Sequence, residues 1–180
     1  IIPESGVRDT GQFSSDVDLP SDLEVLPEYE FIHKAITEGQ LATIFVTGEA
    51  GTGKSTLIHW LAKNLDNCAL VAPTAVAASN IRGSTIHSFF NLAPTHIDPE
   101  EQRTPSVQAR IVMANMSCLV IDEISMVPPN MIDAIDTILR EARDVDKPFG
   151  GVHVIMVGDL FQLPPVISSD EEKVYYTHRY

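Results

Sequence analysis

Short apolar runs alternate along this chain with longer stretches in which apolar residues recur every three or four positions. The short runs predict buried β-strands, and the periodic stretches predict amphipathic helices. Strands are expected at residues 42–47, 68–72, 118–122 and 153–157. Helices are expected at residues 27–39, 55–65, 75–79, 106–115 and 128–142.

This alternation of strands and helices is typical of βαβ units. It predicts an α/β fold class, a three-layer domain in which a mostly parallel sheet carries helices on both faces. Residues 83–90 are interpreted as a polar loop with a hydrophobic end, and residues 93–105, which contain three prolines, as mostly loop. Residues 1–27 are interpreted as a flexible acidic lead-in, so the folded domain is expected at residues 28–180.

The formal net charge of −13 argues at first against a nucleic-acid partner. Its distribution weakens that objection, because residues 1–30 contain eight acidic residues against one basic residue. Residues 31–169 contain 14 Asp or Glu and nine Lys or Arg, a net charge of −5, without a basic stripe. Nucleic-acid contact is therefore expected to use backbone amides, hydroxyls and helix N-termini, and to be weak in this chain alone.

No apolar run approaches the roughly 18–20 residues that cross a bilayer, and no basic-then-apolar leader opens the sequence. We therefore expect no membrane partner and no secretion, but a cytoplasmic protein in a prokaryote or a nuclear or mitochondrial one in a eukaryote. Cys68 and Cys118 each begin a predicted strand and are interpreted as reduced core residues. The first residue is Ile rather than Met, which predicts a piece of something longer.

One glycine-rich segment fits G-x-x-x-x-G-K-[ST], the phosphate-binding P-loop, and stands between a predicted strand and a predicted helix. Backbone N–H groups and the positive end of the helix dipole would face the phosphates of a nucleoside triphosphate. Lys54 would hold the β- and γ-phosphates, and the Ser55 hydroxyl would ligate Mg²⁺. The expected nucleotide-binding residues are Gly48, Glu49, Ala50, Gly51, Thr52, Gly53, Lys54, Ser55 and Thr56.

The apolar run at residues 118–122 ends in two carboxylates, Asp122 and Glu123. Asp122 would lie beside the Mg²⁺ ion, and Glu123 would orient and deprotonate the attacking water. The alternative is an acidic pair that only faces solvent at a strand end. A switch GTPase would more often show D-x-x-G here and N-K-x-D later, and the latter is absent from the sequence.

Two further segments follow predicted strands. Gln162 comes after the last strand, where an amide can sense the γ-phosphate, although a simple turn is the alternative. Residues 74–90 combine small residues, hydroxyls, a histidine and paired aromatics that could cradle a sugar-phosphate backbone. The alternative there is that Phe89 and Phe90 belong to the core. The remaining histidines show no ligand spacing and are interpreted as surface or packed residues.

These motifs, in this order, resemble the Pif-type DNA helicases, the 5′-to-3′ branch of helicase superfamily 1. The resemblance covers residues 28–166 and is carried by GEAGTGKST at 48–56, APTAVAASNIRGSTIHSFF at 72–90, LVIDEISMV at 119–127 and GGVHVIMVGDLFQLPPV at 150–166. It implies a RecA-like motor domain that hydrolyses ATP and steps along single-stranded DNA, with roles in DNA repair, recombination and telomere maintenance.

Position by position, the resemblance implies specific roles. The catalytic set is Lys54, Asp122, Glu123 and Gln162, with Gln162 coupling the γ-phosphate to DNA. Ser55 and Asp122 would handle the metal. The implied DNA contacts are Thr74, Thr85, His87 and Ser88.

The sequence departs from the family pattern in two places. The family often places a Gln before the P-loop to read adenine, whereas this chain has Glu28, Tyr29 and Glu30 there, so ATP preference follows from the resemblance alone. The family pattern continues beyond the Gln-Leu-Pro-Pro segment with a second motor domain and its arginine, and we expect this domain to be missing from these 180 residues. We therefore expect a monomer that binds nucleotide, hydrolyses it poorly and does not unwind DNA.

Two other functions are weighed against this reading. A P-loop kinase would need an arginine-rich lid and an acceptor pocket, and neither is visible in the sequence. A non-catalytic P-loop interaction module would be free to lose Lys54 and Glu123, and both are present.

Overall fold

The structure is a computed structural model of the 180-residue chain. It describes residues 23–49, 51–93 and 105–159, together with Leu19, Phe161, Lys173, Val174 and Thr177. Most of the predicted lead-in and most of the predicted loop at 93–105 therefore lie outside the described residues, as do Ala50 and Gln162.

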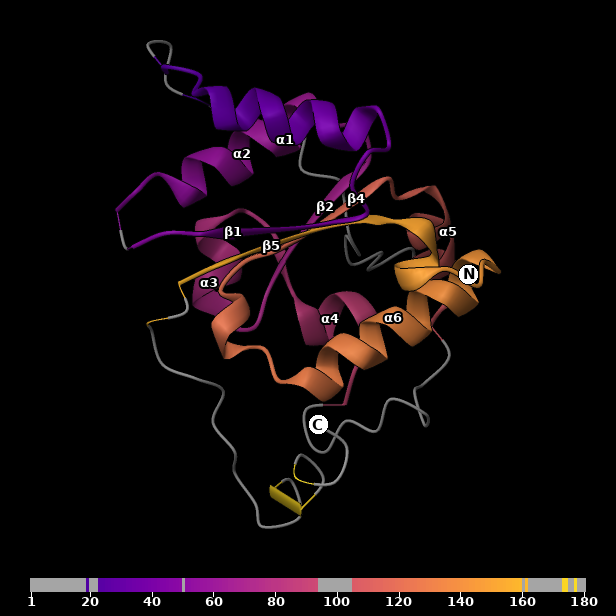
Figure 1. The fold of residues 1–180 in the computed structure, drawn as a ribbon. Helices are drawn as coiled ribbons and strands as arrows, with labels where there is room; N and C mark the ends of the chain where they lie inside the picture. The colour runs from indigo at the N-terminus through magenta and orange to yellow at the C-terminus, as the bar shows by residue number, and fades with distance from the viewer. Residues whose placement is uncertain are drawn as a thin grey trace, which may run out of the picture.

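Five parallel strands form one sheet, in the order β1-β5-β4-β2-β3. The strands are β1 (Thr43–Thr47), β2 (Cys68–Ala72), β3 (Ser84–Thr85), β4 (Cys118–Ile121) and β5 (His153–Gly158). In Figure 1, helices α1 and α2 lie over one face of the sheet, and α4 and α6 lie over the other. The predicted three-layer α/β fold class is confirmed.

Six α-helices and two short 3₁₀ helices occur among the described residues. They are α1 (Pro27–Thr37), α2 (Lys54–Asn64), α3 (Ala75–Asn80), α4 (Ile86–Phe90), α5 (Val107–Asn115), α6 (Pro129–Arg143), η1 (Ile124–Met126) and η2 (Pro148–Gly151). The five helices and four strands expected from periodicity are all present, with ends that differ by at most a few residues. None of the helices in the described ranges combines the length and apolar character that crossing a bilayer requires.

The stretch interpreted as a polar loop at residues 83–90 instead contains β3 and α4. That prediction was wrong because a two-residue strand and a five-residue helix are too short to show a hydrophobic period. Gly83 admits the close approach of this stretch to β2, since a Cβ at that position would overlap the carbonyl group of Leu70. Thr85 then ends β3 and begins α4.

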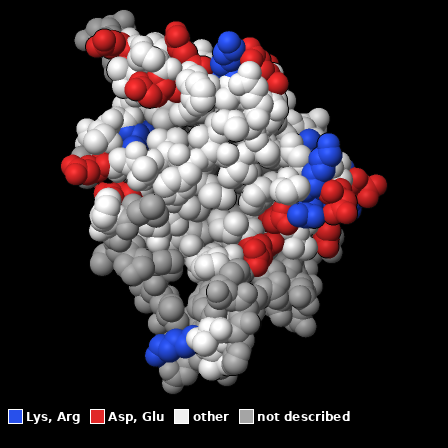
Figure 2. Space-filling model, in the orientation of Figure 1, with Lys and Arg blue, Asp and Glu red and all other residues white. Residues whose placement is uncertain are grey.

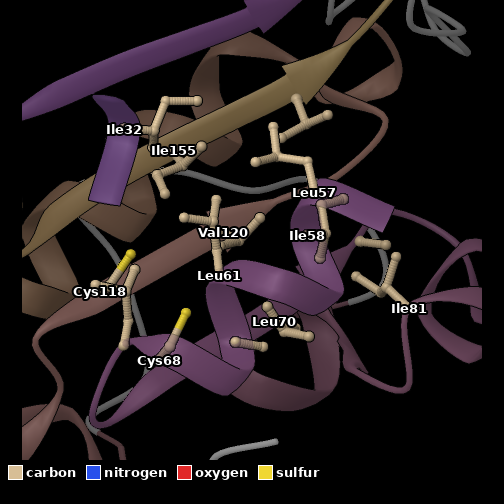
Figure 3. Packing of buried hydrophobic residues seen from close by; sticks show 14 of the residues in the cluster. Ile32, Leu57, Ile58, Leu61, Cys68, Leu70, Ile81, Cys118, Val120 and Ile155 are labelled. Carbon is tan, nitrogen blue, oxygen red and sulfur yellow. The ribbon is translucent and has the colours of Figure 1, made fainter. Parts of the chain in front are cut away.

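Two apolar clusters pack on opposite faces of the sheet, because successive side chains of each strand point to alternate faces. One cluster joins the sheet to α1, α2 and α3, and the other joins it to α4, α5 and α6. Figure 3 shows the first cluster, where side chains of α1 and α2 meet side chains of the strands. They include Ile32, Leu57, Ile58, Leu61, Leu70, Val120 and Ile155. Strands β2, β4 and β5 contribute side chains to both clusters and are thereby packed on both faces.

Cys68 and Cys118 are register partners on the neighbouring strands β2 and β4, and both are buried and free. Their side chains lie close together in Figure 3. A hydrogen bond with Cys68, together with burial, raises the pKa of the Cys118 thiol well above its ordinary value. This agrees with the prediction of reduced core cysteines, because a buried protonated thiol reacts poorly.

Strand β1 departs from its prediction as a buried strand. Its residues alternate between exposed and half-buried, and Phe45 is 44% exposed. The reason is its place in the sheet: within the described residues β1 pairs only with β5 and forms an edge. Ile44 and Val46 pack against the cluster beneath α1 and α2, while Phe45 points to the opposite face.

Arg143, at the end of α6, ties several segments together. Its guanidinium donates hydrogen bonds to the carbonyl oxygens of Met113, Ala114 and Met116 at the end of α5, at 2.9–3.0 Å. It also donates to the Gly150 carbonyl at 2.8 Å. The last carbonyl groups of a helix have no partners within it, so this one side chain satisfies the end of α5.

Candidate active site

The sheet brings the predicted functional segments together at its carboxyl edge, the side on which all the strands end. Because all five strands are parallel, their carboxyl ends lie on the same side, where open α/β sheets bind ligands. The P-loop follows β1, Asp159 follows β5, Asp122 follows β4, Thr74 lies shortly after β2, and Thr85 ends β3. The predicted phosphate and carboxylate residues thus lie toward one end of this edge, and the predicted DNA contacts lie toward the other.

The P-loop closes on itself through the side chain of Lys54. Its ammonium group donates hydrogen bonds to the carbonyl oxygens of Gly48, at 2.6 Å, and Glu49, at 2.8 Å. The Thr52 hydroxyl donates to the same Glu49 carbonyl at 2.9 Å. A Cβ on Gly48 would lie 2.7 Å from the Thr52 hydroxyl oxygen, so a larger residue there would displace this hydroxyl from its place in the loop. The lysine charge is held within the loop, where a phosphate would be bound.

Helix α2 begins without a side-chain cap. Gly51 and Gly53 have φ values of +81° and +89°, a left-handed conformation that glycine adopts without strain. Gly53 is the N-cap residue, and the first turn contains no acidic residue. The N–H groups of that turn and the positive end of the dipole are therefore directed to the loop, as an anion site requires. The arrangement fits phosphate groups.

Asp122 is a buried carboxylate, 8% exposed, at the end of β4. Burial raises the pKa of Asp122, and the charge of Glu123 raises it further, while the Glu123 backbone N–H and the charge of Lys54 oppose the shift. A desolvated carboxylate of this kind gains from a nearby cation. Asp122 therefore suits the predicted role beside a metal ion.

Glu123 has a left-handed backbone conformation, with φ 51° and ψ 44°. A residue with a side chain rarely adopts this conformation, and such outliers concentrate at functional sites. The chain turns sharply here, so that Asp122 continues the sheet, with its N–H bonded to the Val71 carbonyl at 2.9 Å, while Glu123 starts η1. The two predicted carboxylates thus have different surroundings.

Among the described residues, no group of three or more His, Cys, Asp or Glu side chains is placed to hold a metal ion. Mg²⁺ is usually bound through one or two carboxylates together with phosphate oxygens and water, so a protein-only cage is not required. The buried Asp122 carboxylate and the exposed Ser55 hydroxyl at the start of α2 fit that mode. Such a metal would be held jointly with the nucleotide.

Asp159 is a buried carboxylate for which the sequence predicted no role. It is 7% exposed, and its carboxylate accepts a hydrogen bond from the Phe161 backbone N–H at 3.0 Å. It follows β5, which lies between the P-loop strand and β4. The signal was an aspartate directly after an apolar run, as at Asp122. Gln162, the residue predicted in this segment, lies outside the described residues.

Two of the four residues predicted to contact DNA cap helices. The Thr74 hydroxyl oxygen accepts the Ala77 N–H at 3.2 Å and begins α3. The Thr85 hydroxyl oxygen accepts the Ser88 N–H at 3.2 Å and begins α4. His87 is half-buried and Ser88 is exposed. All four lie at the β2–β3 end of the sheet edge, and each capping hydroxyl keeps its own proton for donation.

The aromatic pair beside these residues belongs to the core. Phe90 is fully buried, and the Phe89 ring lies edge-on to it, with centroids 4.9 Å apart. Phe89 is partly buried against the same cluster. The structure therefore supports the alternative of core packing over base stacking for this pair.

Charged side chains are unevenly spread over the surface. On the face shown in Figure 2, acidic side chains gather at the top, where α1 lies, and the centre is uncharged. Lys and Arg side chains at the right of that view are mixed with acidic ones. Within the described part of this face they form no continuous stripe, in keeping with the mildly acidic charge of residues 31–169.

A family model described as PIF1-like helicase matches residues 26–177 of the chain. The chain is 40% identical over 148 residues to the ATP-dependent DNA helicase PIF1 of Saccharomyces cerevisiae, covering 77% of the chain and 17% of that protein. It is 39% identical over 160 residues to the Homo sapiens ATP-dependent DNA helicase PIF1, covering 85% of the chain and 24% of that protein. It therefore spans less than a quarter of either relative.

Solved structures show the same similarity. A Pif1 helicase from Bacteroides in complex with ADP-AlF3 and ssDNA matches with a TM-score of 0.79 and 40% identity, over 88% of this chain and 37% of that one. The Pif1 helicase of Candida albicans matches with a TM-score of 0.69 and 34% identity, over 81% of this chain and 34% of that one.

Proposed function

We propose, since the chain belongs to the PIF1-like helicase family, that it is the nucleotide-binding first motor lobe of an ATP-dependent 5′-to-3′ DNA helicase. The observation that carries this proposal is the arrangement of the P-loop and the Asp122–Glu123 pair at one edge of a parallel sheet. The structure of the Bacteroides relative in complex with ADP-AlF3 and ssDNA supports both proposed ligands.

The proposed chemistry is attack of water on the γ-phosphorus of ATP. Glu123 accepts a proton from the water as the water oxygen bonds to the γ-phosphorus. The bond between the γ-phosphorus and the β–γ bridging oxygen breaks, which releases ADP. The P-loop N–H groups and Lys54 stabilise negative charge on the phosphate oxygens. Ser55 and Asp122 would hold Mg²⁺, which neutralises phosphate charge when bound.

The DNA side of the site is proposed at the ends of β2 and β3. Thr74, Thr85, His87 and Ser88 would contact the sugar-phosphate backbone, chiefly through hydroxyl and N–H donors. Gln162 would couple the γ-phosphate to this region. Ser88 offers the cleanest test, because it is exposed and contributes its backbone N–H, rather than its side chain, to the cap made by Thr85.

The rest of the proposed machine lies in parts of the relatives that this chain does not match. A second motor domain would supply an arginine, an addition that in related phosphoryl-transfer enzymes changes the rate by about 10³–10⁵. The chain alone, acting as a monomer, would bind nucleotide, hydrolyse it slowly and not separate strands. No observation on the structure favours the kinase or the non-catalytic module over the helicase lobe.

The test is phosphate release by a longer form of the protein, with and without single-stranded DNA. We expect DNA to stimulate release, and we expect Glu123→Gln to lower the stimulated rate by about 10²–10⁴ while leaving nucleotide affinity nearly unchanged. Ser88→Ala should weaken DNA binding without changing the rate at saturating DNA. Turnover that stays at the wild-type rate in Glu123→Gln would overturn the proposal.

A further inference from the structure

Helix α1 touches the nucleotide site through an aromatic group. The Tyr29 ring on α1 lies 5.8 Å from the ring of Trp60 on α2, and the His33 ring packs edge-on against the same indole, also at 5.8 Å. Trp60 is the only tryptophan in the chain. Tyr29 is 6% exposed and belongs to the cluster beneath α1 and α2.

Polar contacts from α1 reach both ends of α2. The Tyr29 hydroxyl donates to the Gly53 carbonyl at 3.4 Å, at the N-cap. The His33 Nε2 lies 3.0 Å from the Asn64 carbonyl, at the last residue of the helix. Trp60 packs against the rings of both Tyr29 and His33. Helix α1 therefore contacts α2 at both ends and in the middle.

The Gly53 peptide is where the P-loop becomes a helix. Its carbonyl also accepts the Leu57 N–H at 3.0 Å, a bond of the first turn of α2. A Cβ on Gly53 would lie 3.4 Å from the Tyr29 hydroxyl oxygen, so the tyrosine stands directly against this left-handed residue. Burial, and then the charge of Glu28, raises the pKa of Tyr29, so the hydroxyl remains a donor at neutral pH.

We propose that Tyr29 is a positioning residue for the nucleotide site. Its hydroxyl fixes the Gly53 peptide, so that the N–H groups of Lys54, Ser55 and Thr56 point into the P-loop before nucleotide arrives. Because Tyr29 also packs on Trp60, occupancy of the P-loop changes the surroundings of the indole. The inference rests on the proposed nucleotide site and adds a role for a residue outside the P-loop.

The test compares Tyr29→Phe, which removes one hydroxyl and keeps the ring, with Thr37→Val in the 180-residue chain. Thr37 is the matched control because its hydroxyl lies on the same helix and bonds only to carbonyl groups of α1. Affinity for Mg-ADP is measured by calorimetry, the emission of Trp60 is recorded at saturating nucleotide, and the Tm of each nucleotide-free chain is taken.

We expect Tyr29→Phe to weaken Mg-ADP binding by about two- to tenfold, the range for one neutral hydrogen bond. The change in Trp60 emission at saturation should also be smaller than in the wild-type chain. Thr37→Val should bind as the wild type does, and the two variants should differ little in nucleotide-free Tm. A purely structural role for Tyr29 would lower Tm without altering the emission change.

Besides a lower Tm with an unaltered emission change, two results would overturn the inference. One is Tyr29→Phe binding with wild-type affinity and full emission change, while Lys54→Ala abolishes binding; the proposed nucleotide site then stands without a role for Tyr29. The other is a wild-type chain that does not bind Mg-ADP in calorimetry, which removes the proposed site and the inference with it.

Discussion

The N-terminus of α2 differs from those of α3, α4 and α5. Each of the latter three has a Ser or Thr cap, and the hydroxyl oxygen of that cap accepts a hydrogen bond from a backbone N–H at 3.2 Å. The cap residues are Thr74, Thr85 and Ser106 respectively. Helix α2 has Gly53 instead, with no side-chain cap. A side-chain cap stabilises a helix by about 0.5–2 kcal/mol. Helices α1 and α6 also begin without a side-chain cap, but each has a proline at its start, which has no N–H group to satisfy. Helix α2 has neither a cap nor a proline, and its first N–H groups face the P-loop.

This difference shows what a helix start with neither a side-chain cap nor a proline can offer a ligand. In α3, α4 and α5 a side chain of the protein satisfies one of the first N–H groups, whereas α2 leaves these donors for a partner from outside. The hydrogen bonds between α1 and α2, together with the packing of Leu57, Ile58 and Leu61 in the core, keep α2 in place without a cap. The same contrast can be tested by changing each kind of helix end.

The largest effect on stability is expected at the C-terminus of α5, where the Arg143 side chain satisfies the last carbonyl groups as a cap satisfies the first N–H groups. Arg143→Met should lower the free energy of unfolding by about 2–4 kcal/mol, because it leaves carbonyl groups of α5 and Gly150 without their charged donor. Chemical denaturation measures the change. Arg110→Met, on the exposed side of α5, is the control, and an equal loss there would deny Arg143 its special role.

The second effect is the response to nucleotide. Mg-ADP at a hundred times its Kd should stabilise the wild-type chain by about 2.7 kcal/mol, which raises its Tm. Lys54→Ala should lose most of this stabilisation, since the charge within the P-loop is removed. Thr85→Ala should retain it fully. Loss of the nucleotide response in Thr85→Ala would break the distinction between capped and uncapped ends.

A smaller effect is expected from the caps. Thr74→Ala and Thr85→Ala should each lower the free energy of unfolding by about 1 kcal/mol. Thr→Ser at the same positions keeps the hydroxyl and should recover most of that loss. The measurement is denaturation without nucleotide or DNA, so that the structural role of each hydroxyl is separated from its proposed contact with DNA. A stable alanine variant would contradict the cap assignment.

The smallest effect concerns Asp122 and pH. Burial raises the pKa of Asp122 above its ordinary value of about 3.9, so the folded chain holds this proton more tightly than the unfolded chain. The stabilising contribution is present below about pH 4 and is lost as pH rises through the folded-state pKa. Asp122→Asn should therefore be more stable than the wild type at pH 7 without metal, and the difference should shrink in acid. Equal Tm values at pH 7 would contradict this.

Local pattern was enough to predict most of the fold. The strands and helices expected from periodicity are present because each hydrophobic period extends over several residues within one element. The edge position of β1 could not be predicted, because it depends on the order of strands and not on the strand itself. Nor could β3 and α4, whose few residues are defined by pairing with β2 and by the Thr85 cap.

The candidate site likewise has a part that the sequence predicted and a part that it did not. The P-loop and the Asp122–Glu123 pair were visible because their chemistry is contiguous in sequence. The contact between Tyr29 and Gly53 joins residues 24 positions apart and left no signal. The capping role of Thr85 was hidden because α4 itself was predicted as a loop. Thr74 stands directly before the helix predicted at residues 75–79, but it was assigned only to DNA. The burial of Asp122 depends on packing around a strand end, which no single segment specifies.

The left-handed backbone at Glu123 has a consequence for directed evolution. Glycine accepts that geometry without strain, so a library screened for heat resistance alone should enrich glycine there, a gain of about 1 kcal/mol at best. Every such clone would have lost its proposed water-activating carboxylate. Selection of this chain for thermal stability therefore calls for a simultaneous screen for ATP turnover.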